Sequence, residues 1–433
     1  MKDRKTIHVV TLGCSKNLVD SEHLMRQIEL SGFKVKHNPE KITSGSVIVN
    51  TCGFIKDAKE ESINTILELA EAKLEGKIQH LFVIGCLSEL YKDELKKEIP
   101  EVDQFFGVNS FEEILKSIGV GYRRELLSDR TQTTPKHFAY LKISEGCDRT
   151  CAFCSIPAIR GKHISVPIED LKTEAQKLAN SGVKELILIA QDLTYYGIDI
   201  YKKQRLADLL NELVTIDGIE WIRLHYAYPH PFPVDVIQVM KANPKICRYL
   251  DIPFQHISNK VLKEMRRGND KEQALELIQT LRQELPGIAI RTTLLVGHPG
   301  ETEDDFNELL DFVTNTRFDR LGVFPYSHEE HSYSFTNYSD NVPENIKNER
   351  VERVMELQKK ISEEINQLKI GTIYKVIIDR AEGEYWIGRT EFDSPEVDNE
   401  VLVPVNQKLK IGNFYQVKIT NANEYDMFGE VIC

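Results

Sequence analysis

The stretch Glu145-Gly-Cys147-Asp-Arg-Thr-Cys151-Ala-Phe-Cys154 places three cysteines on one short loop with the spacing C-x3-C-x2-C. It directly follows the apolar run 137–143, which is typical of a strand. Three thiolates can hold three irons of a four-iron cluster. The fourth iron then lacks a protein ligand. A reacting site needs such an open position, whereas in a structural site all positions are filled by protein ligands. A zinc site that takes a further ligand from elsewhere in the chain is the alternative interpretation.

Around this loop, from about Lys136 to Leu368, an apolar strand followed by an amphipathic helix is repeated. The six strand candidates are His137–Ile143, Glu185–Ala190, Trp221–Tyr226, Tyr249–Pro253, Ile288–Val296 and Leu321–Tyr326. Helical patterns lie between most of them, such as 168–180 and 304–313, and residues 343–368 form one long helical pattern rich in Glu and Lys. Six such units in series predict an open or partial βα barrel, with a doubly wound sheet as the alternative.

A smaller α/β unit with a parallel sheet is predicted before this region, up to about Gly121. Its strand candidates are Ile7–Leu12, Val47–Asn50 and Leu81–Ile84. The helical pattern after Asp57 carries apolar residues at helical spacing, namely Ile63, Ile66, Leu67 and Ala70.

Three further cysteines follow the carboxyl ends of the three strand candidates in this unit. They are Cys14, Cys52 and Cys86, and each has a glycine beside it (Gly13, Gly53 and Gly85) that allows close backbone approach. The carboxyl ends of parallel strands share one edge of a sheet, where ligands gather. The three thiols are therefore predicted to hold a second cluster, whereas each one alone would more simply be a buried structural thiol.

The C-terminal segment changes character after about Ile370. Short alternating runs separated by Gly, Asp and Asn predict a small all-β barrel. They are Tyr374–Ile378, Tyr385–Arg389, Glu400–Val405 and Tyr415–Thr420. The segment carries six basic and eleven acidic side chains, so it is acidic. The predicted domains are 5–121, 133–365 and 367–433, within an α/β fold class.

Composition limits the remaining classes of protein. With 433 residues and 41% hydrophobic content, the chain can bury a large core in two or three domains. It has no apolar run of transmembrane length and no signal-peptide pattern at Met1–Lys5, which predicts a cytoplasmic protein without membrane partners. The net charge of −12 makes direct nucleic-acid binding an unfavoured expectation. Eight cysteines in a cytoplasmic chain suggest metal or redox chemistry rather than disulfides.

The cysteine loop 147–154, with the aromatic Phe153 before its last cysteine, resembles the signature of the radical S-adenosylmethionine superfamily. That resemblance implies a partial βα barrel in which Cys147, Cys151 and Cys154 hold a 4Fe–4S cluster whose open iron binds S-adenosylmethionine. The three-part organisation further resembles the methylthiotransferases, which combine a three-cysteine N-terminal domain, a radical core and a TRAM-type barrel. For Cys14, Cys52 and Cys86 it implies a second 4Fe–4S cluster, and it assigns no catalytic residue beyond the cluster ligands.

Several stretches are similar to the RimO branch of that family, which modifies the β-carbon of an aspartate in small-subunit ribosomal protein S-twelve. They are Thr11–Glu22, Ile143–Pro157, Ala190–Gly197 and Tyr326–Glu330. The chain departs from the branch at His331-Ser332 and at 164–167, which bears on substrate contacts and leaves the reaction class unchanged. The resemblance implies a basic ribosomal protein as substrate, an external electron donor and a sulfur source. Modification of isopentenyl-adenosine in transfer RNA is the alternative, favoured less because a barrel that grips RNA should be basic.

Other polar residues receive open interpretations. The loop Val296–Thr302 either approaches the cofactor or simply starts a helix. Gln191 and Asp192 end a strand where side chains often face a cofactor, and Arg223 and His225 either face the barrel interior or form a satisfied core pair. No ligand role is predicted for a last group: His256, His328, His331, Cys247 and Cys433. Two other classes remain: a two-cluster electron carrier, which should have four cysteines per cluster, and an RNA-binding module with structural zinc.

Overall fold

The computed structural model of the chain describes residues 6–126 and 128–432. The chain forms two compact units. The first comprises Met1–Thr134, Tyr140–Arg149 and Ser155–Lys177, and the second comprises Pro135–Ala139, Thr150–Cys154 and Leu178–Cys433. The predicted domain ends at residues 5 and 433, and with them Cys433, lie outside the described residues. Within the described ranges no helix has the length and apolar character needed to span a membrane.

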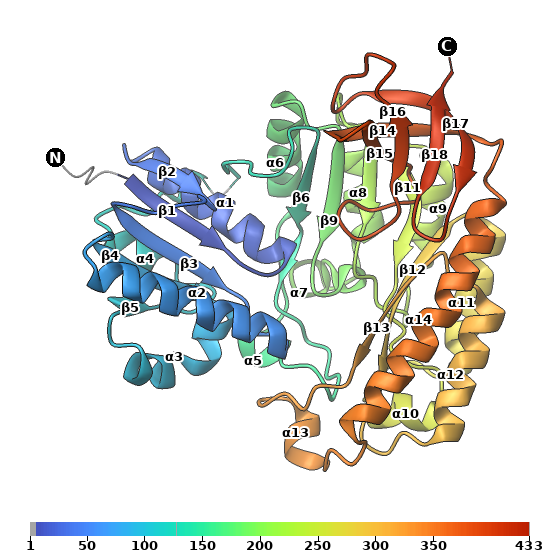
Figure 1. Cartoon of the computed structure of the whole chain (residues 1–433), viewed down its shortest axis with the longest axis horizontal. Helices are drawn as coiled ribbons and strands as arrows, with labels where there is room; N and C mark the ends of the chain where they lie inside the picture. The colour runs from blue at the N-terminus through green and yellow to red at the C-terminus, as the bar shows by residue number, and fades with distance from the viewer. Residues whose placement is uncertain (1–5, 127, 433) are drawn as a thin grey trace. The chain divides into compact units, whose positions relative to one another are not determined.

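The first unit is built on a five-stranded parallel sheet in the order β2-β1-β3-β4-β5 (Figure 1). Its strands are β1 (Thr6–Thr11), β2 (Lys34–His37), β3 (Ser46–Thr51), β4 (His80–Gly85) and β5 (Gln104–Phe105). The helices between and after them are α1 (Ser15–Glu29), α2 (Lys56–Leu74), α3 (Cys86–Glu98) and α4 (Phe111–Ser117). The parallel α/β unit expected from the sequence is therefore confirmed.

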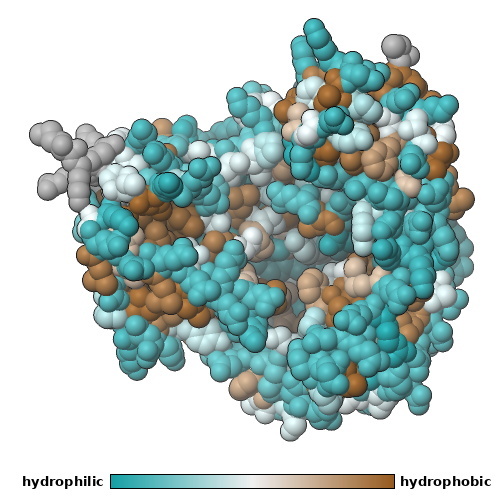
Figure 2. Space-filling view, viewed as in Figure 1, coloured by the Kyte–Doolittle hydropathy of each residue, from teal (hydrophilic) through white to brown (hydrophobic). Residues whose placement is uncertain are grey.

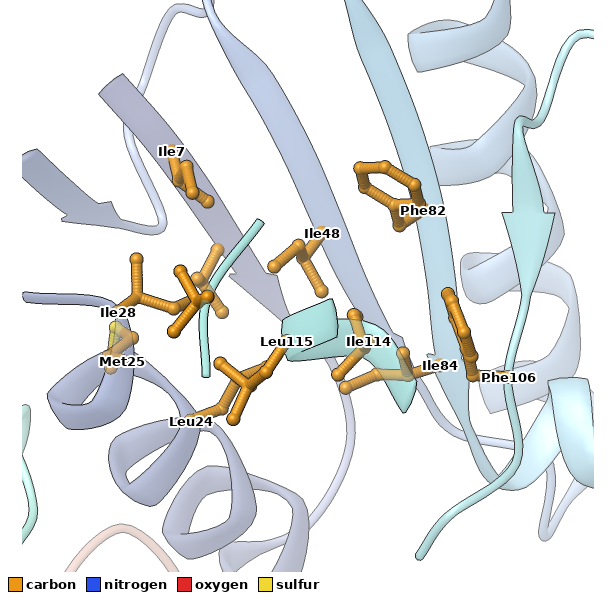
Figure 3. Close-up of a cluster of buried hydrophobic side chains, with 12 residues drawn as sticks. Ile7, Leu24, Met25, Ile28, Ile48, Phe82, Ile84, Phe106, Ile114 and Leu115 are labelled. Carbon is orange, nitrogen blue, oxygen red and sulfur yellow. The ribbon is translucent and has the colours of Figure 1, made fainter. Parts of the chain in front are cut away.

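Alternating side chains of the strands fill two apolar layers, one on each face of this sheet. On one face Ile7, Ile48 and Phe82 pack with Leu24 of α1 and Leu115 of α4 (Figure 3). On the other face Val47, Val49, Leu81 and Val83 pack with residues of α2 and α3. Because both faces are covered, the strands read as continuous apolar runs in the sequence, and their carboxyl ends are left as the polar edge.

The second unit contains an open sheet whose strand order follows the chain order. The order is β6-β9-β10-β11-β12-β13, and β6 (Phe138–Lys142) enters this unit with Phe138 and Ala139. The other strands are β9 (Glu185–Ile189), β10 (Trp221–Leu224), β11 (Ile246–Asp251), β12 (Ala289–Val296) and β13 (Arg320–Pro325). From β9 to β13 the pairs are parallel. A doubly wound sheet reverses its strand order midway, so the sequential order confirms the partial barrel.

Helices connect these strands, as expected for βα units. They are α6 (Ile168–Asn180), α7 (Ile198–Tyr201), α8 (Leu206–Leu213), α9 (Val234–Ala242), α10 (Asn259–Glu264), α11 (Lys271–Glu284), α12 (Glu303–Thr316) and α13 (Tyr333–Asn337), with the 3-10 turn η2 (Leu193–Tyr195). The long helix predicted over 343–368 is α14 (Glu344–Gln367), and its visible face is mostly hydrophilic (Figure 2). Short elements also flank the cysteine loop and its approach, namely η1 (Arg124–Leu126), β7 (Ser144–Glu145), α5 (Ile156–Arg160) and β8 (Ile164–Ser165).

The C-terminal segment forms a closed five-stranded barrel, which confirms the predicted small β-barrel. Its strands are β14 (Ile373–Glu382), β15 (Tyr385–Arg389), β16 (Val401–Pro404), β17 (Phe414–Ala422) and β18 (Met427–Val431). Inward-facing residues such as Val376, Val403 and Val417 are fully buried.

Buried ion pairs attach this barrel to the βα sheet within the second unit. Glu185 of β9 accepts hydrogen bonds from Arg223 Nε at 2.7 Å and from Arg389 Nη2 at 2.8 Å. Arg223 also donates to the carbonyl of Glu391, and His225 contacts Ser394 Oγ at 2.9 Å. All of these side chains except Glu391 are buried, so Arg223 and His225 are satisfied core residues.

Some expectations about local structure are wrong. Leu67, one of the apolar residues at helical spacing in α2, is 47% exposed, because Ile66 and Ala70 occupy the stripe that meets the sheet. Exposed hydrophobic residues are visible among hydrophilic ones over α2 (Figure 2). Strand β11 begins at Ile246, three residues before the predicted start. Five short strands, β2, β5, β7, β8 and β18, were not predicted.

Candidate functional site

The N-terminal cysteine group, Cys14, Cys52 and Cys86, lies at the carboxyl edge of the N-terminal sheet, as predicted. Cys14 precedes α1 directly after the loop from β1, Cys52 follows β3, and Cys86 follows β4 as the first residue of α3. The amide of Asn17 ties this edge together, because its Nδ2 donates to the carbonyls of Leu12 and Thr51 at 3.0 Å each. Asn17 Oδ1 lies 3.8 Å from Cys86 Sγ.

The backbone beside these cysteines fits a closely packed cradle. Gly13 has φ +84°, and a Cβ at this position would lie 2.6 Å from Cys52 Cβ and 2.9 Å from Cys52 Sγ. Only glycine fits there without moving a cysteine. This observation agrees with the close approach that the sequence predicted.

Three thiolates can bind either a single ion or a polynuclear cluster, and the two differ in how far apart the sulfurs stand. Among residues 6–126 and 128–432, no three His, Cys, Asp or Glu side chains have the arrangement that one metal ion requires. A single zinc ion, bound at about 2.3 Å, draws its thiolates to within about 4 Å of one another. In a four-iron cluster each thiolate binds a different iron and stands farther from the others. Cluster ligation by the two cysteine groups stays a prediction, and so does the zinc alternative.

The protonation of the three thiols differs. Burial raises the pKa of Cys86 to about 12, and it also raises the pKa of Cys52. At Cys14 desolvation acts to raise the pKa of the thiol, but the nearby charges of Lys16 and Arg160 lower it below its ordinary value. Cys14 is the exposed member of the group. Since the thiolate is the form that binds metal, Cys14 is the thiol of this group that reaches that form most readily.

A largely buried network of four charges lies beside this group, and every member belongs to the first unit. Arg160 donates through Nη1 to Glu145 at 2.9 Å and to Asp20 at 3.2 Å, and through Nη2 to Asn17 Oδ1 at 2.5 Å. Lys142 pairs with both carboxylates. Burial acts to raise the pKa of the Glu145 carboxyl. The charges of Lys142 and Arg160 outweigh this effect and lower that pKa to about 2. Two cations thus balance two carboxylates at the cysteine edge.

The other cysteine group, Cys147, Cys151 and Cys154, occupies the loop predicted from its spacing. Cys147 belongs to the first unit, and its backbone N–H donates to the carbonyl of Gly161 at 3.1 Å. The glycine before it, Gly146, has φ +71°, and a Cβ there would lie 2.0 Å from the carbonyl oxygen of Lys162. The loop therefore begins with a turn that only glycine fits.

Cys151 and Cys154 belong to the second unit, where hydrogen bonds fix the rest of the loop. The N–H of Cys154 donates to the carbonyl of Cys151 at 3.1 Å, which closes a tight turn. Ala152 between them is fully buried, and its N–H and carbonyl bond to Met265 and Ser334 at 2.8 and 2.7 Å. Two elements distant in the sequence thus hold this turn in place.

The loop 296–302 forms a helix start, which was one of its two interpretations. Thr302 caps α12 in a capping box with Asp305. The Glu301 carboxylate accepts the N–H of Gly297 at 2.7 Å and a bond from Arg350 at 2.9 Å. These contacts give the loop a defined shape, and contact with a cofactor stays a prediction.

The remaining predicted residues have local structural partners. Asp192 caps the turn that follows β9 by accepting the N–H of Thr194 at 2.8 Å. Contact of Asp192 or Gln191 with a cofactor stays a prediction. His328 Nδ1 lies 2.8 Å from Tyr326 Oη, and His256 Nδ1 accepts the N–H of Ser258.

His331 adopts a left-handed conformation with φ +65°. Cys247 is fully buried, in line with a structural thiol.

Sequence reasoning missed the roles of Arg160, Asp20 and Asn17. All three lie within a few residues of a predicted cluster ligand, and that proximity was the only available signal. A charged side chain near a cysteine is usually solvated, so the sequence gave no reason to expect Arg160 to be buried.

Three family models match successive parts of the chain. The model of Uncharacterized protein family UPF0004 matches residues 6–107, that of the Radical SAM superfamily matches residues 141–313, and that of the TRAM domain matches residues 370–432. The solved structure of the radical S-adenosylmethionine methyltransferase TsrM from Kitasatospora setae is similar in fold, with a TM-score of 0.54 at 15% identity over 74% of this chain and 75% of that one. The barrel, the cysteine loop and these matches define a radical S-adenosylmethionine enzyme.

Curated relatives extend along nearly the whole chain. A protein of Bacteroides fragilis is 55% identical over 99% of this chain and 100% of its own length, and one of Cytophaga hutchinsonii is 55% identical over 98% of both. Both are named ribosomal protein uS12 methylthiotransferase RimO. The chain belongs to this RimO family of methylthiotransferases.

Proposed function

We propose that this chain replaces a hydrogen on the β-carbon of an aspartate in ribosomal protein uS12 with a methylthio group. The observation that carries the proposal is the 53–55% identity, over essentially full length, to relatives named as uS12 methylthiotransferases. The alignment includes all three parts of the chain. The transfer RNA alternative has no comparable support among these relatives.

The radical S-adenosylmethionine family uses S-adenosylmethionine and a 4Fe–4S cluster. In this chain Cys147, Cys151 and Cys154 would hold that cluster and leave one iron open for the cofactor. Cys14, Cys52 and Cys86 would hold a second 4Fe–4S cluster. When bound, the first cluster and the cofactor would supply the radical that activates the C–H bond, and the second cluster would present the sulfur.

Within the first unit, residues of the chain link the surroundings of both cysteine groups. Arg160 bonds to Asn17, which contacts Cys86, and to Glu145, which stands two residues before Cys147. A guanidinium makes several directed bonds at once. Arg160 would therefore hold the start of the cysteine loop at a fixed position relative to Cys14, Cys52 and Cys86.

The C-terminal barrel would attract a basic protein substrate. Three of its carboxylates, Asp379, Asp393 and Asp398, are occupied by buried pairs with arginines inside the second unit. Others stay exposed, including Glu382, Glu384, Glu396 and Glu430. Complementary charge of this kind raises the association rate and favours a basic partner over a nucleic acid.

The proposed reaction also implies partners, a location and a domain organisation. An external electron donor and a sulfur source are required partners, and a cytoplasmic location follows from a ribosomal substrate. The domain boundaries are proposed at 5–121, 133–365 and 367–433.

Mass spectrometry of the substrate tests the proposal. Reconstituted protein is supplied anaerobically with S-adenosylmethionine, a reductant and a sulfide source, and is offered purified uS12 or unmodified transfer RNA in separate reactions. A methylthio gain on an aspartate of uS12 is expected. A gain on adenosine alone, or cofactor cleavage with no gain on either substrate, would refute the substrate assignment.

A further inference from the structure

A short turn after α10 contacts the loop that carries Cys151, and both segments belong to the second unit. The N–H of Ala152 donates to the carbonyl of Met265 at 2.8 Å. Two residues further on, Arg267 Nη1 donates to Cys151 Sγ at 3.3 Å. The turn therefore holds the loop through its backbone and places a guanidinium on a sulfur that is a proposed iron ligand.

The position of Arg267 is fixed on three sides. Its Nη2 donates to the carbonyl of Pro253 at 2.6 Å, and its guanidinium lies 4.2 Å from the centre of the Tyr228 ring. Tyr228 Oη in turn accepts the N–H of Gly268 at 2.9 Å. The guanidinium therefore stays at the sulfur without the cost of ordering a flexible side chain.

Arg267 also has an unused donor. Its Nε is buried and has no hydrogen-bond partner among the described residues. A buried N–H without a protein partner is available to an acceptor outside the chain, such as a water or a bound group. A sulfide or a cofactor oxygen beside Cys151 would be such an acceptor.

The charge of Arg267 is secure. Arginine does not deprotonate in proteins under ordinary conditions. A permanent cation with an N–H···S hydrogen bond stabilises the more negative, reduced form of an iron–sulfur cluster.

We propose that Arg267 is a positioning residue that raises the reduction potential of the cluster held by Cys147, Cys151 and Cys154. The inference rests on the ligand roles given to these cysteines under the proposed function. With Arg267 in place, the reduction potential of the S-adenosylmethionine-binding cluster lies closer to that of the external donor, so electron transfer to the cluster is less unfavourable.

An EPR-monitored redox titration of the reconstituted full chain tests the proposal. In R267Q the midpoint potential of the cluster that responds to S-adenosylmethionine should fall. The ratio of reduced to oxidised cluster at a fixed potential should drop at least tenfold, which equals about 59 mV for one electron. The adjacent Arg266 is a matched control, since it is exposed and lies on the Tyr333 ring, and R266Q should keep the wild-type potential.

R267K separates charge from hydrogen bonding, because a lysine ammonium keeps the charge without the planar set of donors. A smaller downward shift is expected for R267K, and it becomes the deciding variant where R267Q does not retain iron. A wild-type potential in R267Q, or in R267K as the deciding variant, overturns the proposal. C151A tests the ligand assignment separately: if the signal that responds to S-adenosylmethionine persists in C151A, the proposed cluster site fails, independently of Arg267.

Discussion

Replacing Arg160 by methionine should destabilise the first unit strongly. Arg160 and Lys142 balance Asp20 and Glu145, and the Arg160 side chain is only 2% exposed. Without Arg160, two carboxylates with side-chain exposures of 8% and 15% share one cation, and one negative charge stays uncompensated. Breaking a buried ion pair on one side typically costs about 3–5 kcal/mol.

This cost translates into a large change in the unfolding temperature. The first unit contains about 170 residues, and for a domain of this size each kcal/mol shifts the midpoint by about 2–4 °C. The R160M variant should therefore unfold about 6–20 °C below the wild type in anaerobic differential scanning calorimetry. Hydrogen exchange at α1 (Ser15–Glu29) assigns the lost stability to this unit.

Two further variants show whether charge balance is the cause. R160K keeps a cation but cannot reach three acceptors, so an intermediate midpoint is expected. Removing Glu145 as well, in R160M/E145M, leaves Lys142 with Asp20 and should recover much of the loss, a non-additivity of the kind double-mutant cycles measure. A loss below about 1 kcal/mol in R160M, or strict additivity in the double variant, would refute the reasoning, because such small values are typical of solvated pairs.

Three other outcomes follow from the structure. Glu185→Gln leaves two buried arginines sharing a neutral amide, so calorimetry should show a loss of about 3 kcal/mol or more in the second unit, and a loss within error would contradict the buried pairing. Burial lowers the pKa of His256 to about 3 from an ordinary value of 6.5, so the histidine stays neutral in the fold and charges on unfolding. Stability should then fall below pH 6.5 by up to about 1.4 kcal/mol per pH unit; a calorimetric pH series should show a flatter slope for His256→Asn, and an unchanged slope would count against this role. Gly13→Ala should lower the iron content by displacing Cys52, whereas Gly119→Ala, at φ +77° with no atom within 4 Å of the new Cβ, should keep the iron; equal iron in both would argue against the cradle.

The strands and the two cysteine groups could be predicted because both depend on local pattern. Buried parallel strands are continuous apolar runs, and their ends fix where the following residue lies. Cys14, Cys52 and Cys86 were placed at one edge by this argument alone. The short strand β2, with the sequence Lys-Val-Lys-His, has too little apolar content to be recognised, and β5 has only two residues.

The charged network could not be predicted because its partners come together only in the fold. Arg160 and Asp20 are 140 residues apart, and Arg389 and Glu185 are 204 apart. Isolated charged residues are most often exposed, so only the packed structure shows that these are buried and paired. The same holds for Arg267, whose contact with Cys151 spans 116 residues.

In the proposed reaction the two cysteine groups serve different steps. The most direct measurement compares wild type with the triple variant C14A/C52A/C86A, each reconstituted anaerobically and supplied with S-adenosylmethionine, reductant and the ribosomal protein. The variant should keep about four of about eight irons and still cleave S-adenosylmethionine, but it should give no methylthiolated aspartate. Wild-type amounts of methylthiolated protein from the variant, or loss of cofactor cleavage with the remaining cluster intact, would contradict the claim.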